Sequence, residues 1–120
     1  MRIDISEEAA EIIRKRKPEN AKLVLNLNDG AGMFSDVAGS CSLDLLFDVV
    51  FANQDAELGE YAAEIESNLG TIFAKPYSLK YLDEGNYLRV SSMGMLVLGG
   101  AYSGMISGNV LLKDKTMILK

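Results

Sequence analysis

Residues 41–51 read Cys41-Ser42-Leu43-Asp44-Leu45-Leu46-Phe47-Asp48-Val49-Val50-Phe51. Apolar residues stand at every odd position, and the polar residues Ser42, Asp44 and Asp48 stand between them. Because side chains on a strand alternate between two faces, the pattern predicts a strand with one apolar face inward and a mixed acidic face outward. On a helix the same apolar residues would scatter around the axis, which argues against a helix.

A second strand is predicted just upstream, because Leu23, Leu25 and Leu27 repeat the alternation. The glycine-rich segment 28–40 separates the two strands and is too long for a tight hairpin. Long loops inside compact domains are often functional, so this segment is the first place to look for a site. Its tip carries the set that we expect to form an interaction loop unless it folds inward: Ala31, Met33 and Phe34.

The rest of the chain alternates short apolar runs with turns. Arg2–Ile5 predicts a short strand, and Ser6 predicts the cap of an amphipathic helix that ends before Pro18. Further short strands are predicted at residues 61–67, 71–74, 87–90, 93–98, 110–112 and 116–119, with a helical turn at 77–83. This order of elements predicts a mainly β fold with one N-terminal amphipathic helix.

Length and charge narrow the classes of function. A chain of 120 residues predicts a single domain over residues 1–120. Its net charge of −5 argues against a nucleic-acid partner, since phosphate binding needs a basic surface. Between Leu23 and Ala74 all charged residues are acidic, and no Lys or Arg occurs. We interpret this segment most simply as a solvated acidic surface.

The absence of histidine and the single cysteine, Cys41, exclude several kinds of chemistry. Ser-His and Cys-His nucleophile pairs, imidazole metal sites and an intrachain disulfide cannot form, so we expect no enzyme. The lack of disulfides and of an apolar leader predicts a cytoplasmic protein.

Residues 90–112 carry no charge, and Gly100, Gly104 and Gly108 recur at the spacing of packed membrane helices. Serines and glycines interrupt the segment, so strands with glycine turns explain it better than a membrane span. An alternative role for these glycines is a sheet edge that pairs with a second copy of the chain, giving a homo-oligomer.

Carboxylates near the central loop are the candidate metal ligands. Asp29 and Asp36 flank the loop tip, and hard cations prefer several oxygens on a flexible loop. The spacing does not match a calcium loop of the EF-hand type, and aspartates beside glycine are commonly turn formers. Cys41 is in phase with the buried face of its strand, where a lone cysteine is most often a small core residue.

Three stretches together resemble the HesB-like family, the A-type scaffold and carrier proteins of iron–sulphur cluster biosynthesis. They are residues 22–33, residues 43–51, and Ser78-Leu79-Lys80-Tyr81-Leu82-Asp83. The likeness runs from Ile3 to about Leu112 and is greatest to the small stand-alone branch of Gram-positive bacteria. It implies a compact twisted barrel or sandwich of short strands behind an N-terminal helix.

The sequence departs from this family where clusters are held. The family carries cysteine in a Gly-Cys-Gly setting after the first long strand, and this chain has Ala31 and Met33 there. The cysteine pair near the C-terminus of many carriers is also missing, and thiolates are what hold iron–sulphur clusters. We therefore expect a HesB-like binding module with no cofactor, whose partner is a cluster-assembly protein or an apo-protein. The alternative is a carrier of iron or a hard cation that uses Asp29, Asp36 or a Cys41 site shared between chains.

Overall fold

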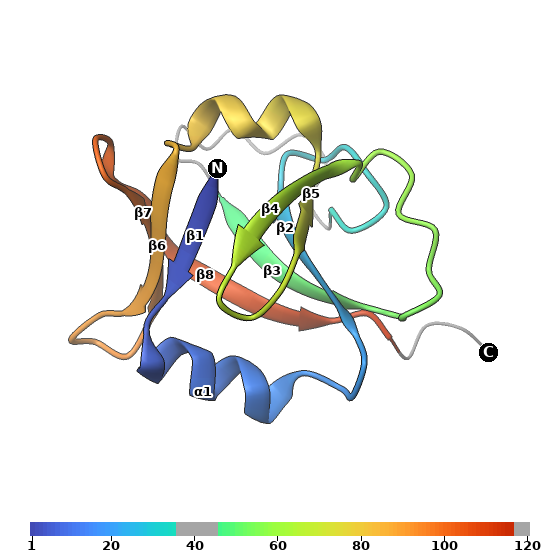
Figure 1. The fold of residues 1–120 in the computed structure, drawn as a ribbon, viewed down its shortest axis with the longest axis horizontal. Coiled ribbons are helices and arrows are strands. Elements are labelled where there is room, and N and C mark those ends of the chain that lie inside the picture. Colours follow the sequence, from blue (N-terminus) through green and yellow to red (C-terminus); the bar gives the residue numbers. More distant parts are fainter. Residues whose placement is uncertain (36–45, 117–120) are drawn as a thin grey trace.

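The structure is a computed structural model that describes residues 1–35 and 46–116, and these residues form a closed β-barrel (Figure 1). The elements in chain order are β1 (Arg2–Ile5), α1 (Glu7–Arg16), β2 (Lys22–Leu27), β3 (Phe47–Ala52), β4 (Ala63–Ser67), β5 (Ile72–Ala74), the 3₁₀ helix η1 (Pro76–Tyr81), β6 (Gly85–Val90), β7 (Leu96–Gly100) and β8 (Gly104–Asp114). The prediction of a mainly β fold behind one N-terminal helix is confirmed.

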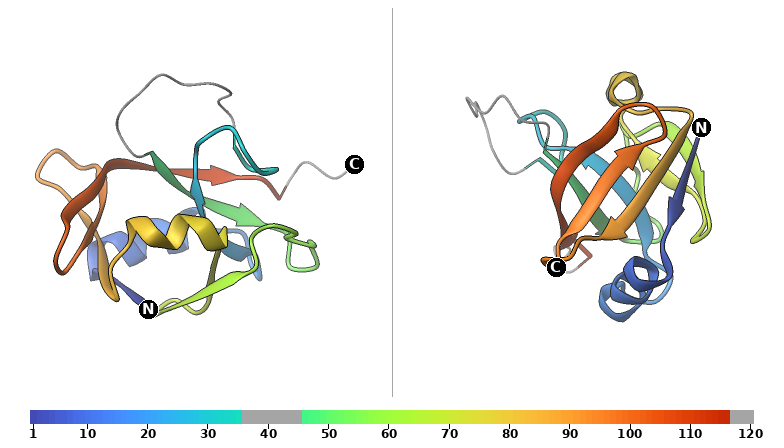
Figure 2. Two further views of the ribbon diagram at one scale, coloured as in Figure 1. Left: turned by 90° about the horizontal axis from the view of Figure 1, so that it is seen from above. Right: turned by 90° about the vertical axis from the view of Figure 1, so that its left-hand side faces the viewer.

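The barrel closes because β1 pairs with strands on both of its edges. The strand order is β1-β4-β5-β2-β3-β8-β7-β6, and β1 runs parallel to both β4 and β6. The pairs β2–β5 and β3–β8 are also parallel, whereas β2–β3, β4–β5, β6–β7 and β7–β8 are antiparallel. Helices α1 and η1 lie on opposite sides of the barrel (Figure 2).

Helix α1 forms where its end signals predict it. The hydroxyl of Ser6 accepts a hydrogen bond from the amide of Ala9 at 3.2 Å, which satisfies one of the free N–H groups of the first turn. Acidic residues occupy the first turn and basic residues the last, as the helix dipole favours. Ala9, Ala10 and Ile13 are buried, so the helix packs one apolar stripe against the barrel.

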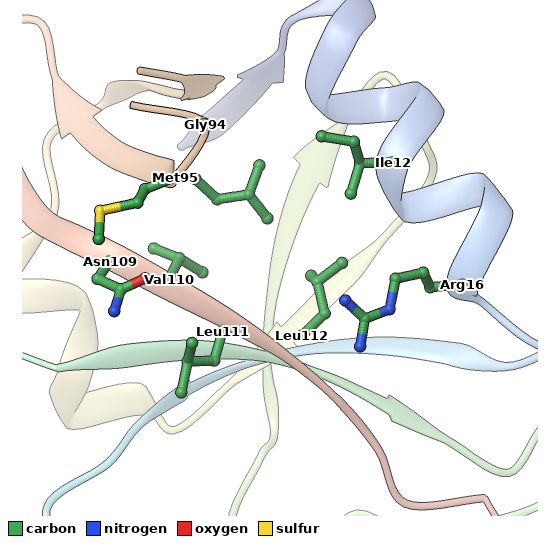
Figure 3. A pocket seen from close by; sticks show the side chains of 9 residues that line it. Ile12, Arg16, Gly94, Met95, Asn109, Val110, Leu111 and Leu112 are labelled. Atoms are coloured by element: carbon green, nitrogen blue, oxygen red, sulfur yellow. The ribbon is translucent and has the colours of Figure 1, made fainter. Parts of the chain in front are cut away.

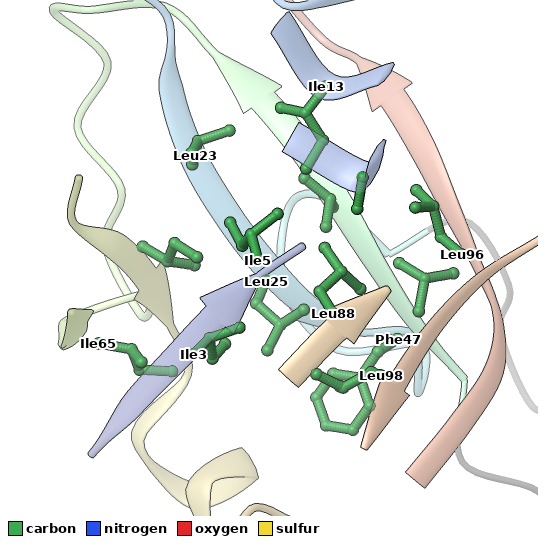
Figure 4. Close-up of a cluster of buried hydrophobic side chains, with 14 of the residues drawn as sticks. Ile3, Ile5, Ile13, Leu23, Leu25, Phe47, Ile65, Leu88, Leu96 and Leu98 are labelled. Carbon is green, nitrogen blue, oxygen red and sulfur yellow. The ribbon is translucent and has the colours of Figure 1, made fainter. Parts of the chain in front are cut away.

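The main core fills the barrel interior with the residues that alternation assigned to it. The antiparallel register pairs Leu23 with Phe51, Leu25 with Val49, and Leu27 with Phe47, and all six side chains belong to one buried cluster. Side chains from α1 and from strands around the barrel meet in this cluster (Figure 4). The inward face predicted for β3 is thus confirmed over residues 47–51, and residues 41–45 lie outside the described part of the chain.

The opposite face of β2 and β3 is also buried, which corrects the expectation of an outward acidic face. Asp48 is 3% exposed and Val50 is fully buried. A second apolar cluster covers this face and comprises Val24, Phe34, Val50, Ala52 and Tyr61. Phe34 and Tyr61 come from two connections, residues 28–35 and 53–62, that fold back over the sheet. Alternation identifies residues that share a face, but it does not reveal whether another segment covers that face.

The uncharged segment 90–112 runs from the end of β6 through the connection to β7, and then through β7 and most of β8. Gly99 and Gly100 lie within β7, which is hydrogen-bonded to β6 on one edge and β8 on the other. Gly100 is therefore not on a free edge, whereas edge pairing through Gly104 and Gly108 of β8 stays a prediction. A Cβ on Gly99 would overlap the ring of Tyr87, and a Cβ on Gly100 would overlap the carboxylate of Asp83.

Several boundaries differ from those predicted. β8 is one long strand where the sequence predicted two short ones at 110–112 and 116–119, and residues 117–119 lie outside the described chain. The helical turn predicted at 77–83 is confirmed as η1. Within residues 1–35 and 46–116, no helix is long and apolar enough to cross a membrane.

Candidate functional site

The loop of residues 28–35 leaves the end of β2 and folds over the outer face of the sheet. Gly32 has φ of +92°, a backbone conformation that side chains other than glycine adopt at a cost. A Cβ at Gly32 would also meet the hydroxyl of Tyr61, so the loop closely approaches the connection between β3 and β4 at this residue. The amide of Ala31 donates to Asp29 Oδ1 at 3.1 Å, which forms a local turn at the loop tip.

A buried lysine lies beneath this loop. Lys75 Nζ donates hydrogen bonds to the carbonyl oxygens of Leu27 at 2.9 Å and Ala31 at 2.7 Å. It also forms an ion pair with Asp29 Oδ1 at 2.9 Å, and its side chain is only 1% exposed. The parallel register of β2 and β5 pairs Leu25 with Ala74, which places Lys75 beside the end of β2 where the loop begins.

Two tyrosines frame the ammonium group. Their ring centres lie 5.8 Å (Tyr61) and 5.4 Å (Tyr77) from Lys75 Nζ, within the range of cation–π attraction. The Tyr77 hydroxyl donates to Asp29 Oδ2 at 2.6 Å, so both oxygens of this carboxylate have partners. The Tyr61 hydroxyl donates to Asn26 Oδ1 at 2.7 Å and accepts from the Phe34 amide at 3.3 Å.

These contacts set the charge state of the site. Partial burial would raise the pKa of Asp29, but hydrogen bonds from Tyr77, Lys75 and the Ala31 amide, together with the Lys75 charge, lower it from 3.8 to about 2. Burial would lower the pKa of Lys75, but Asp29 and Tyr77 raise it above its ordinary value. The two side chains therefore form a charged pair across the neutral pH range.

The Asp29 contacts predict a specific acid sensitivity. A carboxylate whose pKa is lowered in the folded state contributes stability above its unfolded pKa and loses it as pH falls through the folded value. We expect Asp29 to contribute about 1–2 kcal/mol at neutral pH, after allowance for its partial exposure, and to lose it between pH 3.8 and about 2. Urea unfolding of the wild type and of Asp29→Asn, measured from pH 6 to pH 2, checks this.

The difference between the two proteins isolates Asp29, because Asp83 and Asp114, whose pKa values are also lowered, are present in both. The difference should shrink towards zero at pH 2. A difference that stays constant with pH would contradict the assignment.

The structure brings only some of the predicted site residues together. Asp29 and the tip residues share one loop, but Asp36 and Cys41 lie outside the described residues. Ala31 and Met33 are exposed, and Met33 is 55% exposed. Phe34 folds inward, is 6% exposed, and packs on Tyr61 with ring centres 5.2 Å apart. No group of three or more His, Cys, Asp or Glu side chains suited to a metal ion occurs among residues 1–35 and 46–116.

Sequence reasoning missed the residues that organise the loop, namely Lys75, Tyr77, Tyr61 and Asn26. One signal was present for Lys75. It is the first basic residue after a long acidic stretch, and it directly follows the buried strand β5, in phase with Phe73. A charged residue that continues a strand on a covered face must find partners, but the sequence does not identify them.

A second surface feature is a shallow groove between α1 and the β7–β8 hairpin (Figure 3). Ile12 and Arg16 of α1 face Leu112 of β8 across it, and Met95 and Leu111 lie at its far side. Among the described residues that line the groove, Arg16 is the one charged side chain, and these residues form no acid–base pair.

The sequence model described as iron–sulphur cluster biosynthesis matches residues 1–114, which include the barrel and the whole described loop. The chain belongs to this family. This confirms the family that the sequence resembles.

Two solved structures are similar to this iron–sulphur cluster biosynthesis family member. One is a proposed Fe–S biosynthesis protein from Lactobacillus salivarius, with 29% identity, a TM-score of 0.82, and coverage of 95% of this chain and 98% of that one. The other is a proposed Fe–S biosynthesis protein from Lactobacillus acidophilus, with 18% identity, a TM-score of 0.72, and coverage of 95% and 90%; at this identity it supports the fold alone. No curated protein matches the chain.

Proposed function

We propose that this member of the iron–sulphur cluster biosynthesis family is a non-catalytic binding module that presents the 28–35 loop to a partner protein. The proposal places the protein in the cytoplasm and makes its partner a cluster-assembly protein or an apo-protein. On this proposal, one chain by itself does not hold a cluster.

The proposal rests on the residues that fill the inner side and the tip of the 28–35 loop. Its inward-facing oxygens are bound by Lys75, and its two tip positions are Ala31 and Met33. Residues 28–35 therefore contain no thiolate, and their one carboxylate, Asp29, is already paired. Iron–sulphur clusters are held by thiolates, and the sequence has one cysteine. Met33 and Tyr77, which are 55% and 46% exposed, supply apolar contact area on this side of the barrel.

The first test is the iron and acid-labile sulphide content of protein purified without oxygen. We expect folded, monodisperse protein with neither iron nor sulphide in stoichiometric amount. Stoichiometric iron and sulphide that disappear in Cys41→Ser would contradict the proposal and indicate a cluster shared between chains. Iron without sulphide that disappears in an Asp29→Asn, Asp36→Asn double variant would indicate the carboxylate carrier instead.

A pair of methionine variants tests whether the 28–35 loop is the surface that binds the partner. Met33→Asp puts a charge on the loop tip, whereas Met93→Asp puts the same charge on an 83% exposed methionine in the turn before β7. We expect Met33→Asp to weaken binding to cluster-assembly scaffold and apo-protein partners by at least about tenfold, or about 1.4 kcal/mol. Met93→Asp should bind as the wild type does. Equal binding by all three proteins would reject the 28–35 loop as the docking element.

A further inference from the structure

Three oxygen atoms of the 28–35 loop and the end of β2 converge on one point. They are the carbonyl oxygens of Leu27 and Ala31 and Oδ1 of Asp29, and Lys75 Nζ occupies the point at 2.9, 2.7 and 2.9 Å from them. Carbonyl and carboxylate oxygens on a loop are the ligands that hard metal ions take in proteins. In this chain an internal ammonium group stands where such an ion would stand.

We infer that Lys75 is a built-in cation that orders the 28–35 loop in place of a metal ion. We further infer that the oxygen cage around it accepts a small cation once the side chain is removed. The inference deepens the proposed function, because the loop that Lys75 orders is the proposed docking element. Lys75 is thus a positioning residue for that loop.

The chemistry of the ammonium group matches the cage. A lysine ammonium has three donors and no acceptor, and the cage supplies three oxygens. The group is 1% exposed, and a charge buried to that degree is retained only when it is both paired and hydrogen-bonded. Asp29 supplies the opposite charge, and the faces of Tyr61 and Tyr77 complete the surroundings.

The barrel, not the loop, supplies this cation. Lys75 lies at the junction of β5 and η1, where its carbonyl accepts hydrogen bonds from the amide and the hydroxyl of Ser78 at 2.9 and 2.7 Å. Pro76 restricts the backbone directly after it. The ammonium therefore starts from a fixed backbone, and the loop residues 29–31 fold around it.

Ser35 also holds the first half of the loop, because its hydroxyl donates to the Ala31 carbonyl at 2.6 Å, but it brings no positive charge. Tyr77 binds Asp29, whereas Phe34 and Ser35 in the second half bond to Tyr61 and Asn26. Loss of the ammonium would leave two inward carbonyl groups and a carboxylate without this shared partner. Their mutual repulsion favours opening of residues 29–31.

The distances also indicate which cation fits. Oxygens at 2.7–2.9 Å from the central atom are farther out than the roughly 2.0–2.6 Å of magnesium and calcium sites. The cage therefore suits an alkylammonium ion or potassium, which is close to ammonium in size. Tetramethylammonium carries the same charge but has no N–H donor and is too large.

The test compares Lys75→Ala with Lys75→Met, read out by amide hydrogen exchange of Asp29 and Ala31 and by thermal unfolding. We expect exchange at these amides to rise at least about tenfold in both variants relative to amides of β7. Ethylammonium or potassium chloride should restore protection in Lys75→Ala, where the side-chain space is vacant. Neither salt should do so in Lys75→Met, where the apolar stem fills it, and tetramethylammonium chloride at equal ionic strength should have no effect on either.

Unchanged exchange in both variants would overturn the inference, as would wild-type protection in Lys75→Met, because the stem and not the charge would then order the loop. If neither ethylammonium nor potassium chloride restores amide protection in Lys75→Ala, the inference that the oxygen cage accepts a small cation is wrong. If Lys75→Ala does not fold, the exchange of Lys75→Met still decides whether the charge is needed. None of these readouts requires a partner or iron. They can therefore fail or succeed independently of the iron, sulphide and binding measurements that test the proposed function.

Discussion

Replacing Tyr61 by alanine is expected to lower the free energy of unfolding by about 3–5 kcal/mol, the range for removing a large buried aromatic side chain. Tyr61 is 1% exposed and is the largest fully buried side chain in the described chain. Its ring packs on Phe34 and joins the apolar cluster that lies outside the barrel. The substitution therefore removes the side chain on which Phe34 of the 28–35 loop packs, as well as buried apolar contact. Chemical denaturation followed by circular dichroism measures the effect.

Tyr61→Phe is the matched control. It keeps the ring but removes the hydroxyl that donates to Asn26 and accepts from the Phe34 amide. Asn26 is completely buried, so its Oδ1 would lose this donor, at a cost of about 1–3 kcal/mol. A loss below about 1 kcal/mol in Tyr61→Ala would show that the outer cluster contributes little to stability.

The second large effect is expected from Lys113→Met. Lys113 Nζ lies 2.9 Å from Asp48 Oδ2, and the Asp48 side chain is 4% exposed. Within the described residues that oxygen has no aligned hydrogen-bond donor, so the contact is chiefly an ion pair. Removing the cation leaves a buried carboxylate uncompensated, which typically costs about 3–5 kcal/mol. Urea unfolding at neutral pH measures the loss.

The double variant Asp48→Asn, Lys113→Met tests the reason for that loss. With the negative charge also removed, much of the stability should return, because a buried pair itself contributes little net stability. The double variant should therefore be more stable than Lys113→Met alone. If it is equally or less stable, the loss comes from other contacts of the Lys113 side chain and not from the unpaired charge of Asp48.

These predictions concern the covered face of β3, which the sequence assigned to solvent. Asp48 stands between two apolar residues in an alternating strand, and in most sheets such a position is exposed. Here β3 pairs with β8, which brings Lys113 close to Asp48, and two connections cover the remaining surface. The acidic stretch between Leu23 and Ala74 is therefore not one solvated surface, since Asp29 and Asp48 are both paired with lysines beyond its end.

Local chemistry along the chain was sufficient to predict several features. The alternation at 23–27 and 47–51 specified which side chains enter the barrel, since side chains on a strand alternate whatever surrounds it. Ser6 and Pro18 bounded the helix through capping and ring geometry. The stretches from Ile3 to about Leu112 that resemble the HesB-like family also identified the family that the match over residues 1–114 confirms.

Three features could be known only from the folded chain, namely the closure of the barrel, the burial of its outer face and the position of the Lys75 ammonium group. Closure depends on parallel pairs such as β1–β6, whose strands are far apart in the chain and leave no periodic signal in either strand. The three acceptors of Lys75 lie 44–48 residues away along the chain. Whether a lysine is solvated or buried depends on whether such partners converge on its ammonium group. That convergence is a property of the folded chain, because no local pattern around residue 75 encodes the position of residues 27–31.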